Sequence, residues 1–276
     1  MQQQYLELRT RRELGTILSD SFTFARLNLK PLFNVLLKTT GVFFLISVLL
    51  SGFYQYATAA SWITTDPLYF IIALFAMLLG SILFFTSATA AVYSYMENYI
   101  AHKGNIQEEV IIQTTWSKMV QLTLLAFICY FLMTVGFLFF IIPGFYFLVP
   151  IAIIFPIFCF QRLGKIDSIK AAFKLTSGYW WITFGTLFVV SLVIGMISFV
   201  FQLPGSVYVG GRAFFVATEG SEALSGDFIF MILTTIGSAA SSLLSIILVI
   251  AIGLIYFDLD EEKNRTGLKA KLDDLG

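Results

Sequence analysis

The side chains that could perform acid–base, nucleophilic or metal chemistry are few and scattered. His102 is the only histidine, and the two cysteines, Cys129 and Cys159, lie inside apolar runs. Three such residues supply neither a metal-ligand cluster nor a nucleophile beside a general base. We therefore expect no metal, no organic cofactor and no enzymatic activity.

Two charged residues, Lys38 and Glu97, lie near the ends of apolar segments and could pair within the membrane. Alternatively, the long side chain of Lys38 reaches the nearby membrane surface. No carboxylate lies at the centre of an apolar segment, which argues against a path for protons or ions.

The elements that position these residues are apolar helices. The 276 residues are 58% hydrophobic and 12% charged, with a mean hydropathy of +0.86 and no net charge. Such a chain belongs in lipid, and its neutrality excludes nucleic acid as an expected partner. Six segments are long enough to cross about 30 Å of hydrocarbon, and they predict an all-α integral membrane protein: Leu32–Tyr54, Leu68–Tyr95, Met119–Ile141, Phe145–Phe160, Trp181–Phe201 and Phe228–Tyr256.

The charge distribution predicts the orientation of these segments. If the N-terminus is cytoplasmic, all but one of the 17 Lys and Arg residues lie on the inside, Arg212 being the exception. This asymmetry is typical of the positive-inside rule and predicts two cytoplasmic termini. The first 30 residues are too polar for a cleavable signal peptide, so we expect the first spanning segment to serve as an uncleaved signal.

Three stretches between the segments alternate apolar and polar residues with helical spacing: 12–28, 105–118 and 166–178. They predict amphipathic helices on the cytoplasmic surface, with Asp167 and Gly178 capping the third and Asn105 with Glu108 beginning the second. The alternative is that each stretch is the end of the following span. Their order suggests a threefold internal repeat with units at 10–97, 104–161 and 164–257, followed by a cytoplasmic tail at 258–276. The mixed charges of the tail favour a solvated, salt-bridged end, with a short helix as the alternative.

The run FFIIPGFYFLVPIAIIFP at 139–156 contains three prolines. Pro143 and Gly144 predict the turn between the third and fourth segments. Pro150 and Pro156 predict a kinked fourth helix, which either lines a transport path or has its free carbonyls covered by neighbouring helices.

Small residues indicate where helices meet. Gly237, Ser241 and Ser245 recur every four residues in the last segment and predict a close helix contact, within the chain or with another subunit. The predicted outer loop, 203–227, contains apolar residues that could form a small hairpin and contact a partner: Val207, Tyr208, Phe214 and Phe215.

Residues 142–192 combine a Pro-Gly turn, a short apolar segment that ends near Pro156, an amphipathic stretch and then Gly178 with aromatic residues. With Glu13–Phe33 and the tail, this pattern resembles bacterial membrane proteins of the "glycerophosphoryl diester phosphodiesterase membrane domain" type. The resemblance covers most of the chain and implies a multi-pass protein of the bacterial inner membrane. The name of that group comes from fusion to a separate soluble enzyme, for which these residues leave no room, so no phosphodiesterase activity is implied.

Two functions fit the sequence. A non-catalytic subunit or scaffold of a membrane assembly fits the small-residue faces and the apolar outer loop, with membrane lipids and other membrane chains or further copies of itself as partners. A transporter or channel for a lipid or other hydrophobic substrate fits the proline-containing fourth segment and the repeat, because an apolar path requires no charges.

Overall fold

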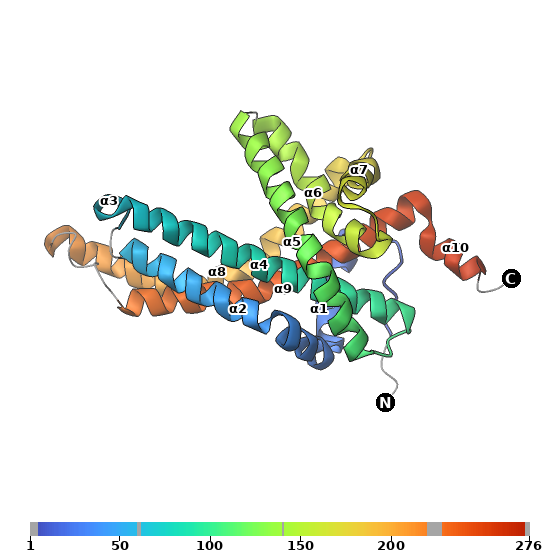
Figure 1. Ribbon diagram of the computed structural model, residues 1–276, viewed down its shortest axis with the longest axis horizontal. Helices are drawn as coiled ribbons and strands as arrows, with labels where there is room; N and C mark the ends of the chain where they lie inside the picture. Colours follow the sequence, from blue (N-terminus) through green and yellow to red (C-terminus); the bar gives the residue numbers. More distant parts are fainter. Residues whose placement is uncertain (1–4, 60–61, 140, 220–227, 274–276) are drawn as a thin grey trace. The chain divides into compact units, whose positions relative to one another are not determined.

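The computed structural model describes residues 5–59, 62–139, 141–219 and 228–273, and the regular structure of these residues is helical, without a strand (Figure 1). The helices are α1 Leu14–Leu27, α2 Leu29–Ala59, α3 Trp62–Thr65, α4 Pro67–Ala101, α5 Glu108–Phe139, α6 Ile141–Gln161, α7 Lys165–Thr176, α8 Trp180–Glu219, α9 Phe228–Asn264 and α10 Thr266–Asp273. The last of these lies in the tail, where the sequence favoured a solvated end and the alternative of a short helix holds.

Six of the described helices are long and apolar enough to cross a membrane, so the chain is an all-α, multi-pass type of membrane protein. Their apolar stretches are Leu29–Thr58, Pro67–Ala101, Glu108–Phe139, Pro143–Gln161, Trp180–Gly211 and Phe228–Asn264. About 20 residues suffice to cross the hydrocarbon layer, and five of the six stretches have at least 30 residues.

The chain divides into two compact units. Unit 1 comprises residues 1–39, 86–192 and 246–276, and unit 2 comprises residues 40–85 and 193–245. The helices α2, α4, α8 and α9 each contribute one part to each unit. The predicted threefold repeat follows different boundaries and stays a prediction.

In unit 1, α5 and α6 form a hairpin, and α7 packs along α6 (Figure 1). A Cβ added at Gly144 would lie 2.7 Å from the Phe137 ring, and one added at Gly136 would lie 3.3 Å from the Gly144 Cα. The two glycines therefore allow α5 and α6 to approach closely. The predicted Ile142-Pro143-Gly144 turn is wrong, because α6 already begins at Ile141 and Pro143 is tolerated in its first turn, where N–H groups have no helical acceptor.

The first and third amphipathic stretches form separate helices, as predicted. Asn28 separates α1 from α2: its amide donates to the Phe24 carbonyl at 3.0 Å, and its oxygen accepts from the Tyr95 hydroxyl at 2.9 Å. Gly178, with a φ of +85°, follows the C-cap of α7, a conformation that favours glycine. The predicted N-cap Asp167 is wrong, because the N-cap is Gly164.

The middle stretch is not a separate helix, so that prediction is wrong and the alternative holds. α5 runs without a break from Glu108 into its apolar part, since residues 108–135 contain neither Gly nor Pro. Its beginning is fixed from α4, where the Asn98 side chain accepts a hydrogen bond of 3.0 Å from the Gln107 N–H.

The predicted hairpin within 203–227 is also wrong, because α8 remains helical to Glu219. Helical hydrogen bonds satisfy the backbone of Val207 and Tyr208 without a partner strand, and Val207 is 69% exposed. Phe214 and Phe215 belong to the same helix, and their side chains lie outside the described part, as do residues 220–227.

The N-terminal segment before α1 is held by unit 1. The Arg12 guanidinium is buried and donates to the carbonyls of Leu8 at 2.6 Å and Thr10 at 3.2 Å, and to the Asp20 carboxylate at 2.9 Å. Because the guanidinium has five donors, one side chain can bind several parts of the segment at once.

Candidate functional site

The two prolines inside α6 do not open a path through unit 1. α6 is one continuous helix, and a larger share of its apolar stretch is buried, 61%, than in any other candidate span of the described chain. Pro150 has no N–H for the Tyr146 carbonyl four residues earlier. That carbonyl instead accepts a hydrogen bond of 3.0 Å from the Trp180 indole. A neighbouring helix thus covers the carbonyl, as the alternative prediction stated.

The charged groups of unit 1 pair with one another. The Glu97 carboxylate accepts from Lys118 at 2.6 Å and from Arg162 at 2.7 Å, whereas Lys38 pairs with Glu108 at 2.6 Å. The possible Lys38–Glu97 pair does not form, since each residue has another partner. The hydrogen bond to Glu97 and its negative charge raise the pKa of the exposed Arg162 guanidinium.

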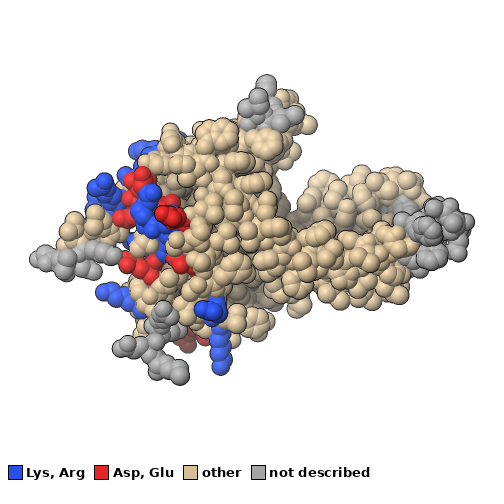
Figure 2. Space-filling model, turned by 180° about the vertical axis from the view of Figure 1, so that it is seen from behind, with Lys and Arg blue, Asp and Glu red and all other residues tan. Residues whose placement is uncertain are grey.

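We call the region that holds the ion pairs around Glu97, and those between the N-terminal segment and α9, the charged end of unit 1. Figure 2 shows Lys, Arg, Asp and Glu side chains collected in one region of the face that it draws. The charged end is formed by Arg11, Arg12, Glu97, Lys118, Arg162, Asp258, Glu262 and Lys263.

No group of three His, Cys, Asp or Glu side chains that could hold a metal occurs among the described residues. Cys129 and Cys159 are both buried thiols.

The small residues predicted on the last span lie in unit 2, where they contact α8. A Cβ at Gly237 would lie 3.0 Å from the Phe201 carbonyl oxygen, so the backbones of α8 and α9 come close at this point. One turn later, the Ser241 hydroxyl accepts a hydrogen bond of 3.2 Å from the Gln202 amide. Ser245 lies on the same helix and donates to the Ser242 carbonyl at 2.6 Å.

Beside this contact unit 2 contains a polar cavity of about 240 Å³, which we call the serine cavity. Ser47, Ser81 and Ser241 lie more than ten residues from either end of their spans, about 15 Å along a helix. Four helices contribute to the lining: Ser47, Val48 and Ser51 of α2, Met77 and Ser81 of α4, Gln202 of α8, and Ser238, Ala239, Ser241 and Ser242 of α9.

Most hydroxyl protons of the serine cavity are already used. Ser81, Ser238, Ser241 and Ser242 each donate to the carbonyl four residues earlier in their own helix, at 2.8–2.9 Å. A hydroxyl oxygen that donates in this way keeps lone pairs for other donors. The cavity therefore offers hydrogen-bond acceptors, and no charged side chain lines it.

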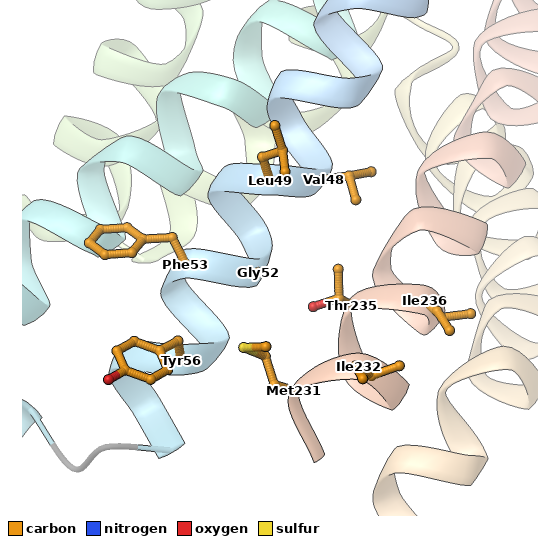
Figure 3. A pocket seen from close by; sticks show the side chains of 9 residues that line it. All are labelled: Val48, Leu49, Gly52, Phe53, Tyr56, Met231, Ile232, Thr235 and Ile236. Atoms are coloured by element: carbon orange, nitrogen blue, oxygen red, sulfur yellow. The ribbon is translucent and has the colours of Figure 1, made fainter. Parts of the chain in front are cut away.

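A second hollow of about 400 Å³ lies next to the serine cavity and shares Val48 with it. We call it the α2–α9 groove; Figure 3 shows Met231 and Thr235 projecting from α9 towards α2, with Gly52 opposite. Two lining residues, Leu49 and Ile236, are 72% and 62% exposed, so the groove opens to the surroundings of the unit. Its lining is Val48, Leu49, Gly52, Phe53, Tyr56, Met231, Ile232, Thr235 and Ile236.

One polar atom in the groove has no partner. The Thr235 hydroxyl is buried and makes no hydrogen bond with the described residues, although a buried hydroxyl is costly to leave unpaired. Its methyl group and hydroxyl lie at 3.5–3.7 Å from the position of a Cβ on Gly52. This oxygen is covered by its neighbours and is not part of the open surface of the groove.

No family model, curated protein or solved structure matches this chain. The fold defines the class, an all-α protein with six helices able to span a membrane, and the function must be argued from the two adjoining hollows of unit 2.

Proposed function

We propose that unit 2 binds a lipid, with its head in the serine cavity and an apolar chain in the α2–α9 groove, and that the protein moves or presents this lipid within the membrane. The observation that carries the proposal is the serine cavity itself. It is a cavity lined by six serines and a glutamine, within helices that span the membrane by composition, beside an open apolar groove.

The hydrogen bonds of the cavity favour a neutral head that carries hydroxyl groups. Polar groups in a membrane interior are costly unless they find partners. Because the serines donate to their own helices, they favour a ligand that donates to them. A phosphate or carboxylate would find few free donors there, and a cation would find no carboxylate. Diacylglycerol, with one hydroxyl and two acyl chains, is the simplest lipid of this kind.

The groove supplies the complementary apolar surface. Its volume of about 400 Å³ is suited to part of an acyl chain, and its exposed residues would be covered by that chain. Each CH₂ group transferred from water to an apolar site contributes about 0.8 kcal/mol, but a chain that arrives from the bilayer gains little of this. Selectivity must therefore come from the serine cavity.

The role as a subunit or scaffold of a larger assembly stays a prediction. It rests on the scarcity of polar groups in the spans, the small-residue faces and the apolar segment 203–227, and of these faces the one at Gly237 contacts α8 within unit 2. Lipid binding has the more specific support, because it accounts for the serine cavity and for the apolar groove beside it.

The proposal includes a location in the bacterial inner membrane with both termini in the cytoplasm. The support is the charge asymmetry, in which Arg212 alone among 17 basic residues falls on the outer side. In this orientation the charged end of unit 1 faces the cytoplasm.

The direct experiment is native mass spectrometry of the protein purified in mild detergent and incubated with diacylglycerol. We expect a bound lipid whose occupancy falls several-fold in Ser241→Val and Ser47→Val. Ser245→Val is the matched control, because it changes the same helix one turn beyond the cavity. Equal occupancy in all four proteins would contradict the proposed site.

A further inference from the structure

The tip of the α5–α6 hairpin carries no group that would hold it in water. No charged residue occurs between Lys118 and Arg162, and a single residue separates α5 from α6. Leu138 and Phe139, at the end of α5, are 74% and 66% exposed. The connections that follow α2 and α8 differ, since they contain acidic residues, Asp66 in the first and Glu222 and Asp227 in the second.

The C-terminal end of α6 is fixed at the charged end of unit 1. Gln161 donates a hydrogen bond of 3.2 Å to the Tyr256 hydroxyl of α9. The next residue, Arg162, pairs with Glu97 at 2.7 Å. Phe160 also packs against Phe257, with ring centroids 4.7 Å apart.

The N-terminal end of α6 is fixed at the charged end as well. Tyr146 accepts the hydrogen bond from Trp180, and their rings stack with centroids 5.8 Å apart. The residue before this tryptophan, Tyr179, donates a hydrogen bond of 3.0 Å to Glu262 of α9. Lys263 donates to the Ser177 carbonyl at 2.8 Å, which attaches the end of α7 to the same place.

These contacts do not fit a helix that crosses the membrane upright. Tyr146 and Gln161 are 15 residues apart, about 22 Å along the axis, and in a crossing helix Tyr146 would lie that far towards the other surface. On α9, Tyr256 and Glu262 are only six residues apart, about 9 Å. Gln161 binds Tyr256 directly. Tyr146 reaches the same region indirectly, through Trp180, whose neighbour Tyr179 binds Glu262.

We propose that α5 and α6 form a re-entrant hairpin, which enters the membrane from the charged side, turns within the acyl layer of that leaflet and returns to the same side. The surface that it presents fits acyl chains: Val120, Leu124, Phe127, Phe131, Leu138 and Phe139 are all exposed. With the orientation proposed above, this leaflet is the cytoplasmic one. The chain would then cross the membrane with α2, α4, α8 and α9.

The sequence lowers the cost of a turn inside lipid. Free backbone groups at helix ends are expensive there. The connection has only one residue, and Pro143 removes one of the N–H donors of the first turn of α6. The re-entrant hairpin occupies area in one leaflet only, so it is also a surface by which the protein interacts with the acyl chains of that leaflet.

Two measurements on the full-length protein in native membranes test the hairpin. In the first, Leu138→Cys is treated with an impermeant maleimide, both in intact cells and in inside-out vesicles. Ile63→Cys and Lys103→Cys mark the two sides of the membrane. The native chain, whose two cysteines are buried, gives the background labelling. We expect each marker to react from one side and Leu138→Cys to react from neither. The two markers report the orientation of the chain. Inversion of the chain would exchange the sides from which the markers react, whereas a crossing hairpin would make Leu138→Cys react from the side of Ile63→Cys.

In the second measurement, the native cysteines are replaced by alanine, because Cys129 and Cys159 lie in the same tryptic peptide as position 146. A flexible bis-maleimide, which spans the length of two aromatic side chains, should join Tyr146→Cys to Trp180→Cys. Trypsin, which cleaves at Arg162 and the lysines of α7, should then release the two peptides linked.

The pair Phe160→Cys and Phe257→Cys serves as the reference at the other end of α6. The proposal is overturned if Leu138→Cys reacts from the side of Ile63→Cys. It is equally overturned if the 146–180 pair stays unlinked under conditions that join the reference pair, because α6 would then not be held at both ends.

Discussion

The Trp180 indole donates a 3.0 Å hydrogen bond to the Tyr146 carbonyl, the group that Pro150 deprives of its partner within α6. The proline therefore creates an acceptor on α6, and α8 supplies the donor. This exchange ties the two helices together near the beginning of α8, and it explains how an apolar helix tolerates an internal proline without a free carbonyl.

The first prediction concerns this pair. Trp180→Phe keeps most of the ring stacking and removes the indole donor, so we expect it to lower the free energy of unfolding by about 1 kcal/mol. In a Pro150→Ala background the backbone N–H of the introduced alanine satisfies the carbonyl instead, and the same Trp180 change should cost clearly less. Thermal unfolding of the native protein, the two single variants and the double variant in mild detergent gives the coupling free energy between the two substitutions. If Trp180→Phe lowered the free energy of unfolding equally with Pro150 present and in the Pro150→Ala background, the indole hydrogen bond would not be compensating for the proline.

The second prediction concerns the charged end. The Lys118 side chain is 14% exposed and relies on Glu97, whereas the Arg162 side chain is 77% exposed. Glu97→Gln should therefore destabilise the protein by about 2 kcal/mol, between the values for exposed and fully buried pairs. Arg162→Gln should cost less than about 1 kcal/mol. If melting temperatures fell equally in the two variants, the buried Lys118 partner would not be the source of the effect.

The third prediction compares two helical glycines of unit 2. A Cβ at Gly237 would lie 3.0 Å from the Phe201 carbonyl, which is backbone and cannot easily move, while a Cβ at Gly195 meets nothing within 4 Å. Gly237→Ala should lower stability by about 1–3 kcal/mol, and Gly195→Ala should leave it unchanged or raise it slightly. A neutral Gly237→Ala in thermal unfolding would mean that α8 and α9 are not in close contact there.

Much of the fold follows from the sequence, because apolar length and helix breaks are local properties. The six apolar stretches and the break before Trp180 were predictable from composition and from residues such as Gly178. The short tail helix was only the alternative to a solvated end. The predicted helix boundaries were wrong where the same residues fit both a turn and a helix. Pro143 and Gly144 resemble a turn, yet in the structure they are a first-turn proline and a packing glycine.

The site could be predicted only in part. The pattern of Gly237 and Ser241 indicated a helix contact, but it could not show that Ser47, Ser81 and Gln202 lie around the same cavity. Ser47 and Ser241 are separated by 194 positions, and only packing brings such residues together. The spacing of Ser47 and Ser51, four residues apart on one helix face, was the local signal available.

Lipid binding in unit 2 is tested most directly by photo-cross-linking with a diacylglycerol that carries a diazirine in its acyl chain. After irradiation in native membranes and peptide sequencing, we expect adducts to concentrate on 48–56 of α2 and 231–236 of α9, and to decrease several-fold in Ser241→Val but not in Ser245→Val. Adducts spread evenly over lipid-exposed residues, including α5, and unaffected by Ser241→Val would contradict the account.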